Sequence, residues 1–437
     1  MTIALQATGR QVPIALVNMI TNQPVANATI DAAGTNATTN SKGMVSIVLP
    51  ANKLVVNGTI SANGYNNELV GIHISSAPTV SQNTFQLTPS GRVYFLSNAT
   101  GTIDVVSTNL DGTNKKIVLQ GTGNESPQST SLIPSADQQY LAFQAQRSSS
   151  SSVTTLYGIS TNNGHLFTID QGTNVSFQPE GWINHYFVYV ETNNSVSNWQ
   201  SGQQILKSYN ADTGKLVTLD QTNGVGTDSN NYAQQQFTAV NLTNDSVIYA
   251  KTWDIYSVYA TTLQGKQNSI YSIQPNATNK VDLHDIQVSA ASLQYYYGYI
   301  QSIQTTPKTI YYQVPTNNYS SYSYLEYNNG TITQPQNYTQ TNFNQQTSTY
   351  QGLSASGLRS LYTASRDGEL AVIIGDQNGN NQKQIALLGG GYSLVGWYGN
   401  DYILLSKSST LYVLSATGQG QPIRISPYLQ TLGPGYA

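Results

Sequence analysis

Histidine is the first side chain to consider for chemistry, and the chain has four copies, His73, His165, His185 and His284. They are scattered, and none has a second histidine or a carboxylate at the spacing of a metal site. A lone histidine in a strand or turn is more often structural than a ligand. The chain also lacks a Gly-X-Ser-X-Gly nucleophile elbow. The sequence therefore predicts no catalytic residue, no metal ligand and no cofactor.

Two turns that contain an aspartate are further candidates for a functional site. The segment Asp376–Asn380 (DQNGN) offers oxygen ligands that would suit Ca²⁺. The alternative is a hairpin turn in which Asn-Gly supplies positive φ, and we favour that turn. The segment Ser365–Gly368 (SRDG) approaches the turn of sialidase-type propellers, but it lacks the tryptophan and occurs once. A glycosidase needs two carboxylates about 5–10 Å apart, and the sequence alone pairs none.

Long polar connections are the best candidates for a binding site. Most predicted connections between second and third strands are short, but those at Arg147–Ser152, Glu191–Gln203 and about Thr252–Gln267 are longer. Long loops on a rigid scaffold are where binding residues usually lie. We predict that four aromatic residues of these loops bind a ligand: Trp199, Trp253, Tyr256 and Tyr259. The alternative is that they pack the loops against each other.

A Gly-Trp pair recurs, at Gly181-Trp182 and at Gly396-Trp397. One interpretation is an aromatic surface at a central channel. The other is a repeated core anchor between neighbouring sheets, with glycine allowing close backbone approach. We favour the anchor.

The elements that would position these residues are short strands in a degenerate repeat. Residues 86–112 read as a turn, an apolar strand, a polar turn, a second strand and an Asp-Gly turn, and copies recur at 132–164, 353–379 and 395–418. Strand pairs repeating at about 40–50 residues are typical of propeller blades. We predict seven blades, with six as the alternative, at about 84–128, 129–175, 176–230, 231–283, 284–345, 346–388 and 389–430. No sustained period of 3.6 predicts helix.

Residues 1–76 differ from the rest and read as a small β-sandwich, with alternating apolar residues in Val45–Leu49 and Val56–Ile60. We expect a domain at 1–78 and a propeller at 79–437. The stretches "QPVANATI", "TTNSKGMVSIVLP" and "ISANGYNNELVGI" resemble the carboxypeptidase-regulatory-like (transthyretin-like) family. That resemblance implies a spacer or presentation domain on an extracellular protein.

The repeats "TPSGRVYFLS" and "SRDGELAVIIGDQNG" resemble TolB-type propeller blades. Longer stretches such as "VGWYGNDYILLSKSSTLYV" resemble an uncharacterised group of surface propeller proteins of reduced-genome bacteria. Members of that group carry an amino-terminal membrane helix, a small sandwich and a propeller. The helix is missing from this sequence, so we expect membrane contact only through an anchor outside it.

Composition narrows the functional classes. Charged residues make up 9% of the 437 residues, against a usual value of about 25%. The net charge is −3 without blocks of like charge, so the basic footprint of a nucleic-acid binder is missing. With no cysteine, disulfides and thiolate metal sites are excluded. A polar, cysteine-free chain of this kind favours an extracellular, cell-surface location.

The sequence thus predicts an all-β protein, a small amino-terminal sandwich followed by a propeller. We expect a non-enzymatic cell-surface protein whose loop face binds a protein or glycan on another cell or on the envelope. The alternatives are a structural subunit of a surface layer and a hydrolase that acts on glycans. Carboxylates clustered at the channel mouth would favour the hydrolase.

Overall fold

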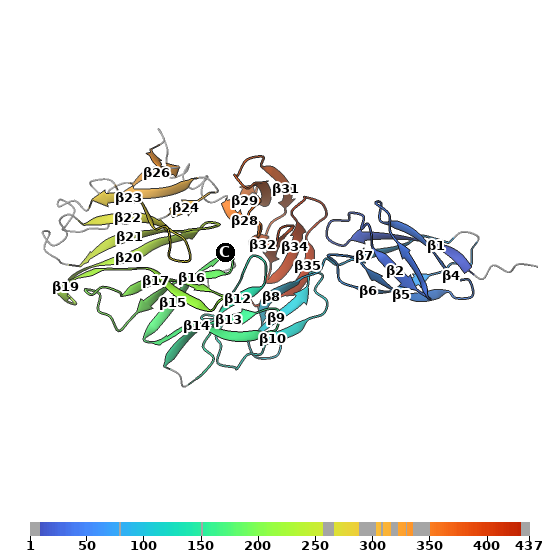
Figure 1. The fold of residues 1–437 in the computed structure, drawn as a ribbon, viewed down its shortest axis with the longest axis horizontal. Coiled ribbons are helices and arrows are strands. Elements are labelled where there is room, and N and C mark those ends of the chain that lie inside the picture. Colours follow the sequence, from blue (N-terminus) through green and yellow to red (C-terminus); the bar gives the residue numbers. More distant parts are fainter. Residues whose placement is uncertain are drawn as a thin grey trace, which may run out of the picture. The chain divides into compact units, whose positions relative to one another are not determined.

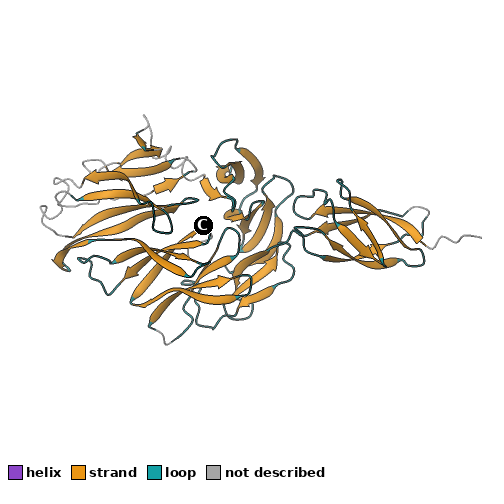
Figure 2. Ribbon diagram, in the orientation of Figure 1, coloured by secondary structure: helices purple, strands orange, loops and turns teal. Residues whose placement is uncertain are grey.

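The computed structural model describes residues 9–77, 80–149, 152–256, 266–287, 303–306, 309–315, 322–328, 330–334 and 350–429. Every regular element in these residues is a β-strand, which confirms the predicted all-β class (Figure 2). None of them belongs to a helix long and apolar enough to cross a bilayer. Two compact units make up the chain: Met1–Val93 with Ser107–Lys116 and Thr410–Pro427, and Tyr94–Val106 with Ile117–Ser409 and Tyr428–Ala437.

Two sheets form the amino-terminal part. The strand order of the first sheet is β4 (Met44–Pro50), β1 (Gly9–Asn18), β7 (Asn83–Leu87). That of the second sheet is β3 (Thr35–Thr38), β2 (Thr29–Ala32), β5 (Val55–Ser61), β6 (Glu68–His73). Because alternate residues of a strand face one side, the apolar alternation puts Ile14, Ile47 and Ile60 in one shared core, where each is at most 1% exposed. Burying such a side chain contributes about 1.5–3 kcal/mol.

Strand β7 corrects the predicted start of the repeats at residue 84. It pairs in parallel with β1, with Ile14 opposite Asn83 and Asn18 opposite Leu87. Phe85 and Leu87 pack in the sandwich core rather than in a propeller sheet. A half-buried edge strand and a blade strand have the same period of two, so the alternation alone did not distinguish them.

Seven small sheets follow in the described part of the chain, each a meander of consecutive strands (Figure 1). Their strands are β8 (Arg92–Ser97), β9 (Asp104–Asn109), β10 (Lys116–Leu119); β11 (Ser131–Pro134), β12 (Tyr140–Gln144), β13 (Val153–Ser160), β14 (His165–Thr173); β15 (Val175–Ile183), β16 (Tyr186–Asn193), β17 (Gln204–Asn210), β18 (Lys215–Gln221); β19 (Gly224–Asp228), β20 (Asn231–Leu242), β21 (Val247–Tyr256), β22 (Gln267–Ile273), β23 (Val281–Gln287); β24 (Ile303–Thr305), β25 (Ile310–Pro315), β26 (Tyr322–Asn328), β27 (Thr331–Thr333); β28 (Tyr350–Leu353), β29 (Arg359–Arg366), β30 (Glu369–Asp376), β31 (Lys383–Leu388); β32 (Ser393–Tyr398), β33 (Tyr402–Lys407), β34 (Thr410–Ser415), β35 (Ile423–Pro427). Residues 288–302 and 335–349 lie outside the described residues, so the number of blades stays a prediction.

The last strand of five of these sheets carries a β-bulge at the same place. One extra apolar residue separates two paired ones, and these extra residues are Ile169, Leu219, Leu283, Ile385 and Ile425. A bulge shifts the alternation of the strand by one position. The residue after the extra one therefore changes sides, and in three sheets it is Asp170, Asp220 or His284.

A buried tyrosine of the following sheet bonds to each of these polar residues. Tyr189 Oη donates to Asp170 Oδ2 at 2.6 Å, and Tyr249 Oη donates to Asp220 Oδ2 at 2.8 Å. Tyr312 Oη lies 2.8 Å from Nδ1 of His284. Each bond joins the last strand of one sheet to an interior strand of the next, and so links neighbouring sheets.

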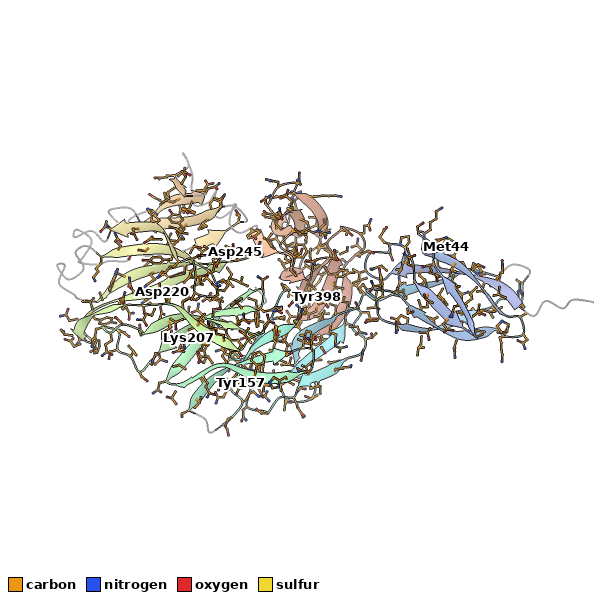
Figure 3. The ribbon with its side chains drawn as sticks, in the orientation of Figure 1. Met44, Tyr157, Lys207, Asp220, Asp245 and Tyr398 are labelled. Atoms are coloured by element: carbon orange, nitrogen blue, oxygen red, sulfur yellow. The ribbon has the colours of Figure 1, made fainter. Side chains whose placement is uncertain are left out.

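Lysines complete two of these contacts. Lys207 Nζ lies 2.8 Å from Asp170 Oδ2 and also contacts Glu191, whereas Lys251 and Lys280 lie 3.3 and 2.9 Å from the Asp220 carboxylate. Burial raises the pKa of Asp220, but Lys251, Lys280 and Tyr249 outweigh it and hold the pKa below its usual value. Figure 3 labels Lys207 and Asp220, which lie on the neighbouring strands β17 and β18 of one sheet.

Candidate functional site

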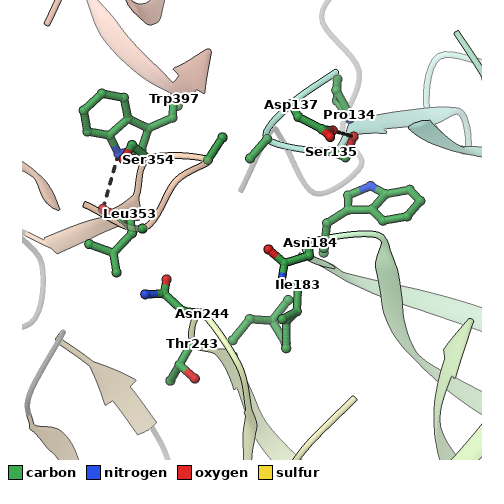
Figure 4. A pocket seen from close by; sticks show the side chains of 18 of the residues that line it. Pro134, Ser135, Asp137, Ile183, Asn184, Thr243, Asn244, Leu353, Ser354 and Trp397 are labelled. Atoms are coloured by element: carbon green, nitrogen blue, oxygen red, sulfur yellow. Dashed lines mark hydrogen bonds between the residues drawn. The ribbon is translucent and has the colours of Figure 1, made fainter. Parts of the chain in front are cut away.

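A cavity of about 640 Å³ lies among the ends of the inner strands of five sheets. Its wall comes from residues 134–138, 180–185, 240–244, 350–357 and 395–397, with Leu404 (Figure 4). These segments are the ends of β11, β15, β20, β28 and β32 and the turns that follow. Because antiparallel strands reverse at each turn, this end of the sheets is opposite to the β16–β17 and β21–β22 connections predicted to bind.

Both Gly-Trp pairs stand at a β-bulge beside this cavity. Gly181 and Gly396 have φ of +132° and +147°, which is backbone that glycine adopts far more readily than other residues. The Nε1 of Trp182 donates to the Ile133 carbonyl at 2.8 Å, and that of Trp397 donates to the Gly352 carbonyl at 3.4 Å. Both indoles therefore anchor one sheet to the preceding one, which is the interpretation we favour, and both also line the cavity.

Glu180 is the extra residue of the first bulge. Pro179 pairs with Tyr189 and Gly181 with Val188, which leaves Glu180 without a partner in the ladder and places it in the cavity wall. Bulges of this kind re-aim a side chain. Gln178 Nε2 donates to Glu180 Oε1 at 3.0 Å. Burial raises the pKa of Glu180 to about 7, so the carboxyl is able to give or take a proton near neutral pH.

The corresponding bulge of β32 carries a different side chain. Leu394 pairs with Leu405 and Gly396 with Leu404, so Val395 is the extra residue there. The cavity wall therefore has an acid on the β15 side and an apolar residue on the β32 side. The repeated Gly-Trp pair is recognisable in the sequence. The two repeats differ in chemistry at the residue before the pair, which is Glu180 in one and Val395 in the other.

His185 is held between two carboxylates, although the sequence presents it as isolated. Its Nε2 lies 2.7 Å from Asp137 Oδ2, and its Nδ1 lies 2.8 Å from Asp212 Oδ2. Tyr140 Oη donates to Asp212 Oδ1 at 3.0 Å, and the Tyr140 ring stacks on Trp182 with centroids 6.2 Å apart. These partners are 48 and 27 residues away in sequence, so no local motif could reveal them. Asp137 and His185 line the cavity.

We expect the pKa of the His185 imidazole to lie above its ordinary value of about 6.5. Burial lowers this pKa, but the hydrogen bonds and charges of Asp137 and Asp212 outweigh burial and raise it. The stabilisation by charged His185 is therefore fully present below its unfolded pKa and is lost as pH rises through the folded pKa. Burial also opposes ionisation of Asp137, but its bond to His185 lowers that pKa, so its contribution is lost when pH falls through the lowered value.

An NMR titration of the His185 ring protons measures this pKa directly. Asp212→Asn removes one of the two charges and should lower the midpoint, whereas Asp228→Asn, at the exposed end of β19, should leave it unchanged. A wild-type midpoint at or below the ordinary value would contradict the arrangement.

The structure describes the side chains of two of the four aromatic residues predicted to bind, Trp199 and Trp253. Trp199 lies in the β16–β17 connection, half-buried, with its ring centroid 6.2 Å from that of Tyr232. The prediction that Trp253 lies in a loop is wrong. It lies inside β21, where its side chain is 2% exposed. Tyr256 ends β21 with its side chain outside the described part, and Tyr259 lies outside the described residues. The two described rings thus pack within the protein.

The segment Asp376–Asn380 forms a turn, which is the structure favoured for it. Asp376 Oδ1 accepts the backbone N–H groups of Asn378 and Asn380 at 2.9 and 3.0 Å, and Gly379 has φ of +75°. The carboxylate of Asp376 is therefore hydrogen-bonded to the backbone of its own turn. No group of three or more histidine, aspartate or glutamate residues placed to hold a metal ion occurs among the residues the structure describes.

Several solved structures are similar to this chain at low sequence identity. The chain is similar to a solved prolyl endopeptidase (12% identical, TM-score 0.42, covering 77% of this chain and 48% of that one). It is also similar to the β-propeller domain of the Trilobed protease from Pyrococcus furiosus (11% identical, TM-score 0.38, covering 86% of this chain and 95% of that one). A third similar structure is TolB from Acinetobacter baumannii (13% identical, TM-score 0.30, covering 75% of each chain). The chain thus spans about half the length of the endopeptidase. No protein-family model matches it, and no curated protein matches it.

These structures include a β-propeller domain and TolB, in agreement with the predicted TolB-like propeller fold. They contradict the prediction that the chain is not an enzyme, because they include enzymes: the prolyl endopeptidase, an acylaminoacyl peptidase from Pyrococcus horikoshii and a putative 6-phosphogluconolactonase from Bacteroides fragilis. At 13% identity or less the likeness concerns the fold alone and assigns no reaction to this chain.

Proposed function

We propose that the protein binds a carbohydrate in the cavity at the inner-strand ends of its propeller. The observation that carries the proposal is the wall, which combines the indoles of Trp182 and Trp397 with the amides of Asn184, Asn241 and Asn244. Aromatic faces pack against the C–H faces of sugar rings, while amides donate to and accept from the hydroxyls. A volume of about 640 Å³ falls among those of small-molecule sites, about 300–1,000 Å³.

The cavity is a better candidate than the loops at the opposite strand ends. Trp253 is buried within β21, and the Asn198 amide donates to Tyr232 Oη at 3.1 Å beside Trp199. These contacts fit loops that support each other. In the cavity, by contrast, the side-chain amides of Asn184 and Asn244 point toward the open space, and Glu180 belongs to the same wall (Figure 4).

We further propose that the carbohydrate belongs to the surface of another cell or to the envelope, and that the protein works outside the cell. The low charge, 9% of residues, and the absence of cysteine support this location. A glycan partner fits the cavity better than a protein partner does, because a protein surface is too large to enter it.

The binding test uses a glycan array, followed by titration calorimetry with the best oligosaccharide. Trp182→Ala should weaken binding about tenfold or more, because it removes one stacking face worth about 1–2 kcal/mol. Trp199→Ala is the matched control, a half-buried tryptophan at the opposite end, and should bind like the wild type. The loop face would be the site instead if only Trp199→Ala lost binding. An array without any bound glycan would overturn the proposal.

A second candidate function is hydrolysis of a glycosidic bond in the same cavity, and the presence of Glu180 and Asp137 in its wall favours it. In that reaction protonated Glu180 gives its proton to the glycosidic oxygen as the bond to the anomeric carbon breaks. Water forms the new bond to that carbon and loses its proton to a carboxylate, for which Asp137 is the candidate. Cleavage of a bound oligosaccharide by the wild type, lost in Glu180→Gln while binding persists, would establish the reaction.

A further inference from the structure

The cavity wall carries negative charge without a basic side chain beside it. Its acidic side chains are those of Asp137 and Glu180, and the imidazole of His185 lies in the same wall. No lysine or arginine occurs among the described residues that line it. An anionic ligand such as a uronic acid would therefore enter without a cation to receive it, and the energy of an unpaired charge in an enclosed site is unfavourable.

The charge of His185 does not change this balance. The imidazole is shared by the carboxylates of Asp137 and Asp212, so one positive charge meets two negative ones. Glu180 has no such partner: only the neutral amide of Gln178 bonds to it among the described residues, and no charged group acts on its ionisation. Glu180 is thus the acid of the wall that lacks a cation.

Trp182 adds a second feature that suits a cation. It follows Glu180 after one residue and lines the same cavity. The face of an indole attracts ammonium groups, and the stacked ring of Tyr140, with its centroid 6.2 Å away, fixes the orientation of the indole. An acid and an aromatic face in one wall suit a ligand that is both a ring and a cation.

We propose that the carbohydrate bound by this cavity is an amino sugar with a free ammonium group, which pairs with the carboxylate of Glu180. This inference rests on the proposed carbohydrate-binding function and names its ligand class. The ammonium would supply the charge partner that Glu180 lacks, and the sugar ring would lie against the indole. Burial raises the pKa of Glu180 to about 7 in the free protein, and a cation beside the carboxylate would lower it. At slightly acidic pH, where the amine of the ligand is already an ammonium ion, binding should therefore release a proton.

Titration calorimetry with two matched ligands tests this inference, namely glucosamine oligomers and N-acetylglucosamine oligomers of the same length. The wild type should bind the free amine about tenfold or more tightly, because a charge-assisted pair replaces a neutral contact. The Glu180→Gln protein should lose this preference while still binding the acetylated oligomer. For the wild type, the measured heat should also vary with the ionisation enthalpy of the buffer, as proton release requires, and this readout needs no variant.

The outcomes separate the two proposals. Equal or tighter binding of the acetylated oligomer by the wild type would overturn the amino-sugar inference and leave carbohydrate binding intact. Heats independent of the buffer at slightly acidic pH, where the ligand is an ammonium ion, would also overturn it. If neither oligomer, nor any other glycan of the array, bound, the carbohydrate function and the inference would both fail.

Discussion

Replacing Asp220 with alanine is expected to lower the free energy of unfolding by about 3–5 kcal/mol, the effect of removing one partner of a buried ion pair. Lys251, whose side chain is 9% exposed, would lose its carboxylate 3.3 Å away. Tyr249 Oη would lose its acceptor at 2.8 Å. Both groups would remain buried at the boundary between two sheets, where water does not easily replace the lost partner.

Urea denaturation of the full chain, followed by circular dichroism, measures this loss. The matched control is Asp401→Ala, because Asp401 is 63% exposed and lies 3.4 Å from Arg359. A surface pair of that kind contributes about 0–1 kcal/mol. If Asp220→Ala were no more destabilising than the control, the contact between sheets would not be what stabilises this boundary.

The same carboxylate gives a pH signature. Its folded pKa is lowered by Lys251, Lys280 and Tyr249 against the effect of burial. The stabilisation is therefore present above the unfolded pKa of about 3.9 and is lost as pH falls through the folded value. The difference in stability between wild type and Asp220→Ala should accordingly shrink in acid.

The strands could be predicted from the sequence, whereas the contacts between sheets could not. Apolar runs and Gly-rich turns mark each strand, so the all-β class followed from local pattern. The tyrosine contacts have no fixed spacing, since Asp170 and Tyr189 are 19 residues apart, Asp220 and Tyr249 29, and His284 and Tyr312 28. The repeated letters "TIDQ" and "TLDQ" were visible, but only the bulge before each aspartate explains its direction.

The candidate site escaped prediction for a similar reason. Its wall is assembled from turns of five sheets, and no single turn has a recognisable motif. Glu180 acquires its chemistry from the bulge at Gly181 and from burial. His185 acquires its partners from two other turns. Such a site is defined by which inner-strand ends meet, and that follows from the packing of the sheets rather than from local sequence.

Strand β21 shows where polarity misled the sequence analysis. The run Thr252–Asp254 is polar apart from Trp253, and the sequence pattern predicts a loop there. In the structure the strand continues through it, paired with the long strand β20, and the side chain of Asn268 accepts the Trp253 backbone N–H at 2.8 Å. Buried polar groups with partners cost little, so a strand can continue through a polar run that reads as a loop.

Trp253→Ala is accordingly expected to act on stability rather than on binding. The side chain is 2% exposed, and truncating a buried tryptophan to alanine costs about 3–5 kcal/mol. Trp253→Phe should cost less, because the indole Nε1 has no hydrogen-bond partner among the described residues and phenylalanine removes that group. Trp199→Ala, at a half-buried position, should cost roughly 1–2 kcal/mol.

Urea denaturation ranks the three variants, and glycan binding is measured on the same samples. Any variant that is still folded under the binding conditions should keep wild-type affinity, because the cavity lies at the opposite strand ends. Wild-type stability of Trp253→Ala combined with lost binding would mean that this tryptophan contacts the ligand after all, and it would return the site to the β21–β22 side of the propeller.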